Sequence, residues 1–430
     1  MSVTRRVITC GLCHQEGHNR RTCQNNHNNK QTMPILLCND LMNYILNYVP
    51  NDAVTLNNVQ LSCKSFKLNA EPRMYELFWK PIEWLGKENC EGLRKNTLKK
   101  LIIPHNKSED WRTTIKNLFY MLERNTSIKI LDLQHLYDMV DDSDIIGKLI
   151  KKNKYLESLC LYGMIIDVDT ICDALKSNYT LKELDLSFSV MGFLDTHCIS
   201  ELLKANSSLE VLHLNEIDLE YSEKGIHMLS RALKVNTSLK VLSLGKLQNY
   251  NEKDFIDLLI SLKTNNTLTE LNIGCNGDLE DVESFAICIA ELLDGNTSLK
   301  KIDLSCNEIN SDGVTKIAMG LMNNKTLTHL DLRYCNAGND GAWAIGHLLK
   351  HNNTLKDIGL YNNHITDKGA KYIYNGLVEN NSLERITFSP EDYYIDGVIN
   401  RDTLELLQQL VEQKENLTIH DGWHDVSIFD

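Results

Sequence analysis

The sequence predicts an α/β solenoid, with a parallel sheet along its concave side and helices along its convex side. A unit of 25 to 31 residues recurs through residues 98–388. Each copy opens with alternating apolar residues and continues with apolar residues at helical spacing. One strand and one helix cannot bury their own apolar faces, but stacked copies share a continuous core. The repetition therefore predicts one elongated array in place of several separate domains.

The recurring unit is recognised by its first apolar anchor. The C-terminal copies are the clearest, and they begin with Leu-x-x-(Leu/Ile)-x-(Leu/Phe). The anchors are Leu98, Ile128, Leu156, Leu181, Leu209, Leu239, Leu268, Leu299, Leu327, Leu355 and Leu383. These anchors predict about eleven rungs of the solenoid.

A period of two predicts the strand of each unit. Leu330 and Leu332 alternate with His329, Asp331 and Arg333, which is typical of a short strand with one buried face. The following stretch changes to helical spacing, as at Val314, Ile317, Met319 and Leu321. Strand and helix therefore alternate through the repeats.

Asparagine or cysteine follows the strand in four C-terminal copies, at Asn276, Asn307, Cys335 and Asn363. The units resemble the ribonuclease-inhibitor class of leucine-rich repeats, whose convex side is helical. The resemblance implies that these side chains satisfy backbone groups in the turn. The N-terminal copies depart from it, and we expect less regular loops there. The equivalent residues are Leu136, Met164, Ser189, Ile217 and Leu247.

Triplets that could accept a glycan recur at one position of the unit, between the helix and the next strand. Asparagine tolerates the left-handed backbone of a helix C-cap there, which explains the recurrence better than glycosylation does. The asparagines are Asn125, Asn178, Asn206, Asn236, Asn265, Asn296, Asn352 and Asn380.

The repeat pattern weakens in residues 389–430. Leu404, Leu407, Leu410 and Val411 lie on one face of a predicted helix. We interpret this segment as a C-terminal cap made of a helix and a closing strand.

Composition limits the classes of partner. The net charge of −13 argues against nucleic-acid binding by the whole chain, although residues 1–30 carry five basic residues and one acidic residue. Thirteen cysteines, an odd number, favour a reducing compartment over a secreted disulfide framework. The chain has neither a membrane-spanning apolar run nor a signal-peptide core at its start. We therefore expect an intracellular protein, cytoplasmic or nuclear, without a membrane partner.

Residues 1–27 contain a spacing typical of a metal site. Cys10, Cys13, His18 and Cys23 are separated by two, four and four residues, and three thiolates with one imidazole complete a tetrahedral zinc shell. The segment resembles a CCHC zinc knuckle, with Gly17 before the histidine ligand. The resemblance implies one structural zinc ion.

Zinc knuckles often bind single-stranded RNA by stacking bases on side chains that follow the first cysteine and the histidine. Here those residues are Gly11 and Asn19, so the stacking platform is absent. Arginines in the segment remain available for phosphate contacts. Nucleic-acid binding therefore stays open beside a protein-binding or purely structural role.

After a flexible linker, residues 28–32, residues 33–80 predict a small helical domain. The segment resembles an F-box, although Cys38 replaces the usual first proline and the aromatic after the lysine is shifted. The resemblance implies docking onto the Skp-type adaptor of a cullin-RING ubiquitin ligase. The residues that would bind it are Leu37, Leu41, Ile45, Leu46, Val49, Pro50, Leu61, Lys64 and Phe66. The alternative is a plain helical cap, and residues 81–97 connect this domain to the repeats.

The concave side of the repeats is the expected binding surface. Acidic groups predominate at its outward positions, which favours a basic protein partner, although an acidic protein simply exposes acidic residues. The positions are Asp132, Glu183, Asp185, His213, Glu270, Asn272, Asp303, His329, Asp331, Arg333, Asp357, Tyr361 and Arg385.

The sequence contains no phosphate-binding loop, nucleophile elbow or metalloprotease motif, so we predict no enzyme activity. The favoured function is a substrate-recognition scaffold that recruits a protein to a ubiquitin ligase. Two alternatives stay open: an RNA-binding protein led by the knuckle, and a regulatory scaffold without ubiquitin chemistry. The abundant asparagine and the domain combination resemble proteins of large DNA viruses.

Overall fold

The computed structural model describes most of the repeat region. The described residues are 93, 96–103, 111–134, 136, 142–189, 193–219, 225–277, 281–388 and 399–420. The predicted knuckle, the linker, the helical domain and most of the connector lie outside them.

Twelve short strands form one parallel sheet in the described residues, each paired with the next strand along the chain. They are β1 (Lys100–Ile102), β2 (Ile130–Asp132), β3 (Ser158–Cys160), β4 (Glu183–Asp185), β5 (Val211–His213), β6 (Val241–Ser243), β7 (Glu270–Asn272), β8 (Lys301–Asp303), β9 (His329–Asp331), β10 (Asp357–Gly359), β11 (Arg385–Thr387) and β12 (Thr418–His420).

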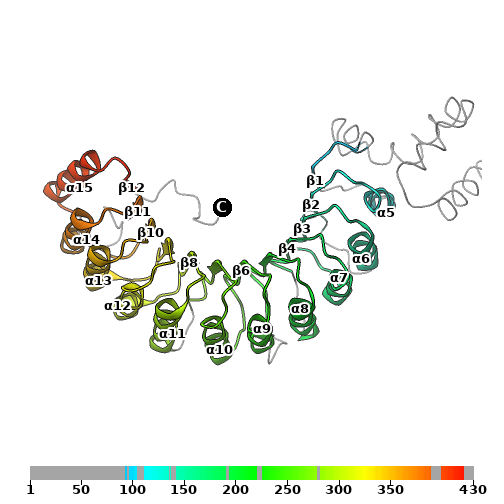
Figure 1. Cartoon of the computed structure of the whole chain (residues 1–430), viewed down its shortest axis with the longest axis horizontal. Coiled ribbons are helices and arrows are strands. Elements are labelled where there is room, and N and C mark those ends of the chain that lie inside the picture. The colour runs from blue at the N-terminus through cyan, green and yellow to red at the C-terminus, as the bar shows by residue number, and fades with distance from the viewer. Residues whose placement is uncertain are drawn as a thin grey trace, which may run out of the picture. The chain divides into compact units, whose positions relative to one another are not determined.

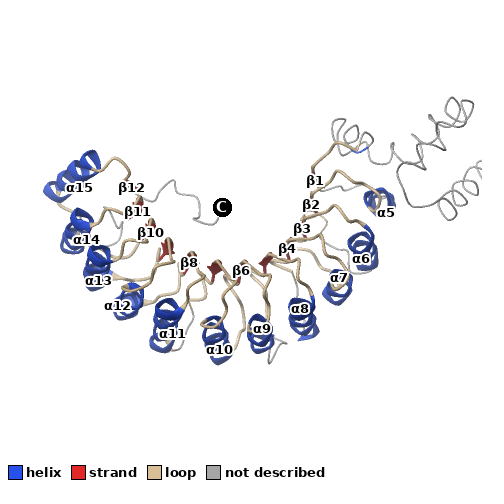
Figure 2. Ribbon diagram, viewed as in Figure 1, coloured by secondary structure: helices blue, strands red, loops and turns tan. Residues whose placement is uncertain are grey.

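A helix follows each strand from β1 to β11. The helices are α5 (Trp111–Leu122), α6 (Ser143–Lys152), α7 (Val168–Leu175), α8 (Phe193–Ala205), α9 (Gly225–Leu233), α10 (Glu252–Leu262), α11 (Val282–Gly295), α12 (Asn310–Leu321), α13 (Gly338–His351), α14 (Asp367–Glu379) and α15 (Arg401–Gln413). The strands line the inner side of the repeats and the helices the outer side (Figures 1 and 2). The predicted α/β solenoid is confirmed. In the segment 389–430, α15 precedes β12, which pairs with β11.

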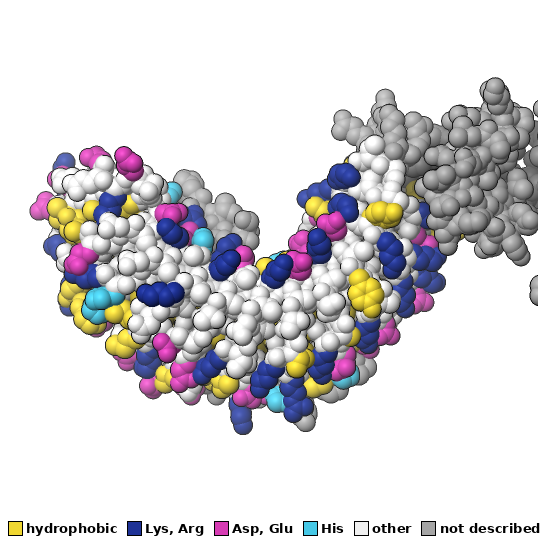
Figure 3. Space-filling view, in the orientation of Figure 1, with side chains coloured by type: hydrophobic (Ala, Val, Ile, Leu, Met, Phe, Trp, Pro, Cys, Tyr) yellow, Lys and Arg dark blue, Asp and Glu magenta, His cyan; other side chains and the backbone are white. Residues whose placement is uncertain are grey.

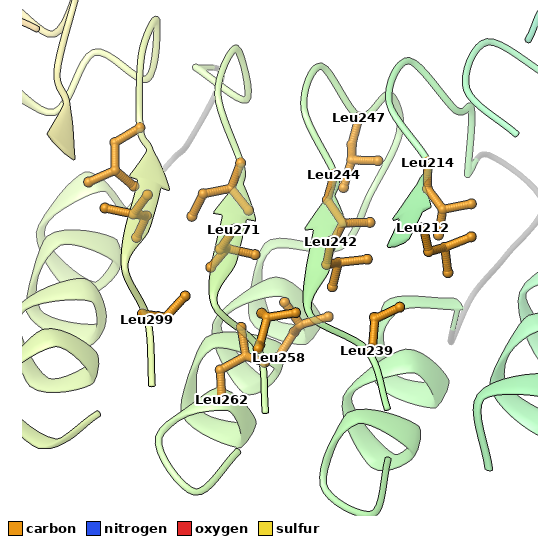
Figure 4. Close-up of a cluster of buried hydrophobic side chains, with 14 of the residues drawn as sticks. Leu212, Leu214, Leu239, Leu242, Leu244, Leu247, Leu258, Leu262, Leu271 and Leu299 are labelled. Atoms are coloured by element: carbon orange, nitrogen blue, oxygen red, sulfur yellow. The ribbon is translucent and has the colours of Figure 1, made fainter. Parts of the chain in front are cut away.

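The leucines of the strands and helices form one continuous core. Ten of the eleven predicted anchors are buried, and Leu98 is partly buried against the same core. Figure 4 shows Leu212, Leu242 and Leu271 of β5, β6 and β7 side by side, with Leu258 and Leu262 of α10 below them. Because the register aligns one leucine with the next from rung to rung, each rung buries its neighbour's apolar side chains.

A ladder of buried asparagines joins the repeats where each helix gives way to the next strand. Near the C-terminal end of the ladder, the Asn352 amide nitrogen donates to the carbonyl oxygens of Leu321 (3.0 Å) and Asn324 (3.1 Å). Its Oδ1 accepts from the backbone N–H groups of Thr354 and Leu355, both at 2.9 Å. The ladder comprises Asn125, Asn153, Asn178, Asn206, Asn236, Asn265, Asn296, Asn324, Asn352 and Asn380.

The expected left-handed backbone at these asparagines is wrong. The helix C-caps Asn153, Asn296, Asn352 and Asn380 have extended backbone, with φ between −73° and −91°. Asparagine occupies the position because its amide both donates and accepts, and so satisfies backbone groups of two successive repeats. The eight asparagines named above as recurring glycan-acceptor positions are all buried.

A second set of side chains closes the turn after the strand, as the repeat resemblance implies. Asn307 Nδ2 donates to the carbonyl oxygens of Ile273 and Leu304, each at 2.9 Å. Its Oδ1 accepts from the Asn276 N–H at 2.8 Å. In the N-terminal copies, the equivalent residues fill the same place as buried side chains without such an amide: Leu136, Met164, Ser189, Ile217 and Leu247.

None of the helices in the described residues combines the length and the apolar character needed to cross a membrane.

Candidate functional site

The concave face, as we define it, consists of two columns of side chains that project from the first and third residues of the strands. The first column is Lys100, Ile130, Ser158, Glu183, Val211, Val241, Glu270, Lys301, His329, Asp357, Arg385 and Thr418. The second column is Ile102, Asp132, Cys160, Asp185, His213, Ser243, Asn272, Asp303, Asp331, Gly359, Thr387 and His420. All predicted concave residues stand in these columns except Arg333 and Tyr361, which lie in the loops after β9 and β10.

Carboxylates of the second column have a role in the fold. The Oδ1 atoms of Asp185, Asp303 and Asp331 each accept from the backbone N–H two residues later, at 2.8 to 2.9 Å. Burial, followed by the charge of the neighbouring Asp331, raises the pKa of Asp303. These contacts stabilise the turn after the strand, so acidic residues here do not by themselves indicate a basic partner.

Basic side chains neutralise most of the acidic groups in the C-terminal half of the concave face. Arg385 contacts Asp357 at 2.6 Å across the sheet, and Arg333 contacts Asp331 at 2.6 Å. Lys301 pairs with Glu270 at 3.2 Å. Figure 3 shows basic and acidic side chains both gathering along the inner side of the repeats.

The acidic excess therefore concentrates on β2 and β4. Asp132, Glu183 and Asp185 are half-buried there and form no ion pair within the described part of the chain.

A third column, which we call the rim, lies three residues beyond the strands and has left-handed backbone. Its φ angles run from 55° to 67° at Gly163, Phe188, Glu216, Lys246, Cys275, Cys306, Tyr334 and Asn362. The reason is a hydrogen bond between rungs. The Phe188 N–H donates to the carbonyl oxygen of Asn215 at 2.7 Å, and the Tyr334 N–H donates to that of Tyr361 at 3.0 Å. The turn fixes the backbone whichever residue occupies the position.

Two aromatic pairs stand on or beside the rim. Tyr162 and Phe188 are stacked, with ring centroids 5.8 Å apart and planes at 16°. Tyr334 and Tyr361 meet edge to face at 5.6 Å and 71°. Phe188 is 53% exposed and Tyr334 is 45% exposed. Of these four residues, only Tyr361 was predicted from the sequence. A signal for the others was present, because Tyr162 and Tyr361 both stand two residues beyond their strands, and Phe188 and Tyr334 both stand three residues beyond theirs.

The rim also brings two cysteines side by side, Cys275 after β7 and Cys306 after β8. A hydrogen bond from Cys306 lowers the pKa of the exposed Cys275 thiol to about 7, and Lys246 contributes in the same direction against opposing burial. Burial raises the pKa of Cys160 and of Cys335 to about 12. Of Cys160, Cys275 and Cys335, Cys275 therefore has by far the largest thiolate fraction at neutral pH.

We expect Cys275 to be alkylated by iodoacetamide faster than Cys160 or Cys335, with a rate that falls as the pH drops below about 7. The alkylation rate falls at low pH because only the thiolate reacts, and the thiolate becomes protonated below the pKa of the thiol. Peptide mass spectrometry after timed alkylation from pH 5.5 to 8.5 measures the profile. Cys306→Ala removes the hydrogen bond and should move the midpoint to higher pH. An unchanged midpoint in that variant would contradict the assigned cause.

Among the residues that the structure describes, one group of side chains on the convex side could hold a metal ion. His227 of α9 and Asp254 and Asp257 of α10 place one ligand atom each within 4.8 Å of one another, and all three are half-buried. The predicted zinc ligands Cys10, Cys13, His18 and Cys23 lie outside the described residues. So do the predicted adaptor-binding residues between Leu37 and Phe66.

Comparison with known proteins supports the repeat assignment. The leucine-rich-repeat family model matches residues 264–282, 295–318, 323–346 and 351–373. No curated protein matches the chain.

Three solved structures illustrate the likeness. A leucine-rich repeat-containing protein of Legionella pneumophila, LegL7, is 14% identical, with 76% of this chain and 99% of that chain covered and a TM-score of 0.45. A chain of the yeast Rad7 and Elc1 complex is 15% identical, with 90% and 93% covered and a TM-score of 0.46. Leiomodin-1 actin-binding site 2 is 23% identical, with 39% and 91% covered and a TM-score of 0.33.

Proposed function

We propose that this leucine-rich-repeat chain is a non-enzymatic recognition scaffold that holds a protein partner against its concave face. One observation carries the proposal: twelve aligned strands of the described residues line one side of the repeats with columns of side chains, and two partly exposed aromatic pairs stand on or beside the rim. Exposed aromatic side chains beside a polar surface are typical of protein interfaces. Repeat arrays use such extended concave surfaces for binding.

The finer proposal is that residues 33–80 recruit this scaffold to a ubiquitin ligase. The support is the F-box resemblance of Leu41, Ile45 and the neighbouring apolar positions, together with their place before the repeats, from which only the connector 81–97 separates them. The segment would bind a Skp-type adaptor, and the concave face would present the substrate. Such a complex operates inside the cell, in the cytoplasm or the nucleus.

Co-purification of the full chain with a Skp-type adaptor tests this function. We expect the adaptor to be recovered with the wild-type chain and lost with the double variant Leu41→Ala and Ile45→Ala. The matched control is Arg385→Ala on the concave face, which should keep the adaptor. An adaptor that never binds, or that binds the double variant equally well, would refute recruitment and leave the plain helical cap.

A second candidate function is single-stranded RNA binding by the knuckle, which the ligand spacing at Cys10, Cys13, His18 and Cys23 favours. We expect about one zinc ion per chain, and loss of that zinc in Cys10→Ser because three ligands no longer close the shell. Metal analysis by mass spectrometry measures this, with Cys275→Ser as the control that keeps its zinc. RNA binding that disappears in Cys10→Ser would support the second candidate. Equal RNA binding by both variants would exclude it.

A further inference from the structure

Phe188 occupies a position that is unfavourable in two ways. Its φ angle of 57° lies in the left-handed region, where a bulky side chain is strained. Its ring is 53% exposed to solvent. Gly163 on the previous rung and Asn362 near the end of the array hold the same turn with residues that tolerate it. The turn does not require phenylalanine, and the outer part of the ring is exposed and available to a partner.

Tyr162 extends this side chain into a broad aromatic surface. It lies two residues beyond β3, and its ring stacks beside that of Phe188 at 5.8 Å and 16°. Tyr162 is itself 36% exposed. The two nearly parallel rings belong to adjacent rungs, whose backbones are joined by the hydrogen bond from the Gly163 N–H to the Ser187 carbonyl oxygen at 2.9 Å. The surface is therefore held rigidly.

The surroundings of this aromatic pair are acidic. Asp132 and Asp185 stand in the second column of β2 and β4, on either side of the rung that carries Tyr162. After burial, the charges of Glu216 and Asp185 are the main causes that raise the pKa of Tyr162. Lys246 acts in the opposite direction, but it is paired with Glu216 at 2.8 Å. The uncompensated charge that acts on Tyr162 is therefore that of Asp185.

We infer that Tyr162 and Phe188, together with Asp185, form an anchor for an arginine or lysine side chain from a basic segment of the protein partner. A flat guanidinium stacks on aromatic faces and pairs with carboxylates, so arginine fits best. Charge complementarity selects this occupant over an acidic or apolar one. The inference rests on the proposed function of the concave face and names the chemistry that it recognises.

The aromatic pair Tyr334 and Tyr361 provides a matched comparison on the same rim. Arg333 precedes Tyr334 in the chain and is bound to Asp331 at 2.6 Å, so the charge beside these rings is already compensated. Tyr334 has a φ of 56° and an exposed ring like that of Phe188. A cationic side chain should therefore prefer the first pair to the second.

Fluorescence anisotropy of the full chain with a labelled arginine–glycine repeat peptide tests the anchor, with the same peptide carrying neutral citrulline as the probe control. Phe188→Ala and Asp185→Asn should each weaken binding about fivefold or more. Tyr334→Ala should change it less than twofold, and the citrulline peptide should bind no variant better than background. Equal affinity of wild type and Phe188→Ala, or of the two peptides, would overturn the inference.

Phe188→Gly separates binding from a packing role. It relieves the left-handed strain, so the melting temperature should stay the same or rise while peptide binding is lost. A lower melting temperature with unchanged binding would assign Phe188 to packing.

Deletion of residues 1–30 tests whether this chain's own basic segment occupies the anchor. If the peptide binds only after this deletion, that segment is the occupant, and the assignment to a protein partner is overturned. A cellular partner could instead fail to bind Lys301→Glu and still bind Phe188→Ala. That result would overturn this anchor alone and would leave the proposed scaffold function in place.

Discussion

Replacing Phe255 with alanine should lower the free energy of unfolding by about 3 to 5 kcal/mol. Phe255 of α10 is fully buried in the middle of the array. Its ring stacks on that of Phe285 at 6.1 Å and meets Tyr250 at 5.2 Å. The substitution removes apolar contacts and opens a cavity. The neighbouring rungs fill this cavity only in part, because their own hydrogen bonds hold them in place.

Urea denaturation followed by circular dichroism measures this effect, and hydrogen exchange locates it. Because each repeat contacts only its neighbours, we expect lost protection to be largest in α10 and α11. Ile260→Ala is the matched control, since Ile260 lies on the same helix but is exposed. It should change stability by less than about 1 kcal/mol. Equal effects of the two substitutions would mean that Phe255 is not a core residue.

Replacing Asn352 with alanine should cost about 3 kcal/mol or more. The side chain satisfies two carbonyl oxygens, those of Leu321 and Asn324, and two N–H groups, those of Thr354 and Leu355. Alanine leaves these groups buried without their partner, and each such group costs about 1 to 3 kcal/mol. Partial entry of water keeps the total below the full sum.

The neighbouring Asn353 gives the matched control, because it is the same residue type, adjacent in the chain and exposed. Asn353→Ala should change stability by less than about 0.5 kcal/mol. Thermal and urea unfolding of both variants compare them directly. If Asn352→Ala were as stable as Asn353→Ala, the ladder would not hold the repeats together.

The repeat architecture could be predicted from the sequence because its signal is local. Leu330 and Leu332 show a period of two within five residues, and Val314, Ile317 and Leu321 show a helical period within eight. Both patterns state which side of a short element is buried, and stacking follows because neither element can bury that side alone. The strand positions of the concave face followed from the same alternation.

The tertiary structure decided which of those positions expose an unpaired charge to solvent. It also decided which side chains stand on the rim. Arg385 meets Asp357 and Lys301 meets Glu270 across about thirty residues of chain. No local period encodes such pairs. In the sequence, Phe188 likewise looks like an ordinary loop residue. Its left-handed turn depends on the hydrogen bond to Asn215 on the next rung. The sequence determined the rungs through patterns within one repeat, whereas the binding surface depends on contacts between repeats, which only stacking creates.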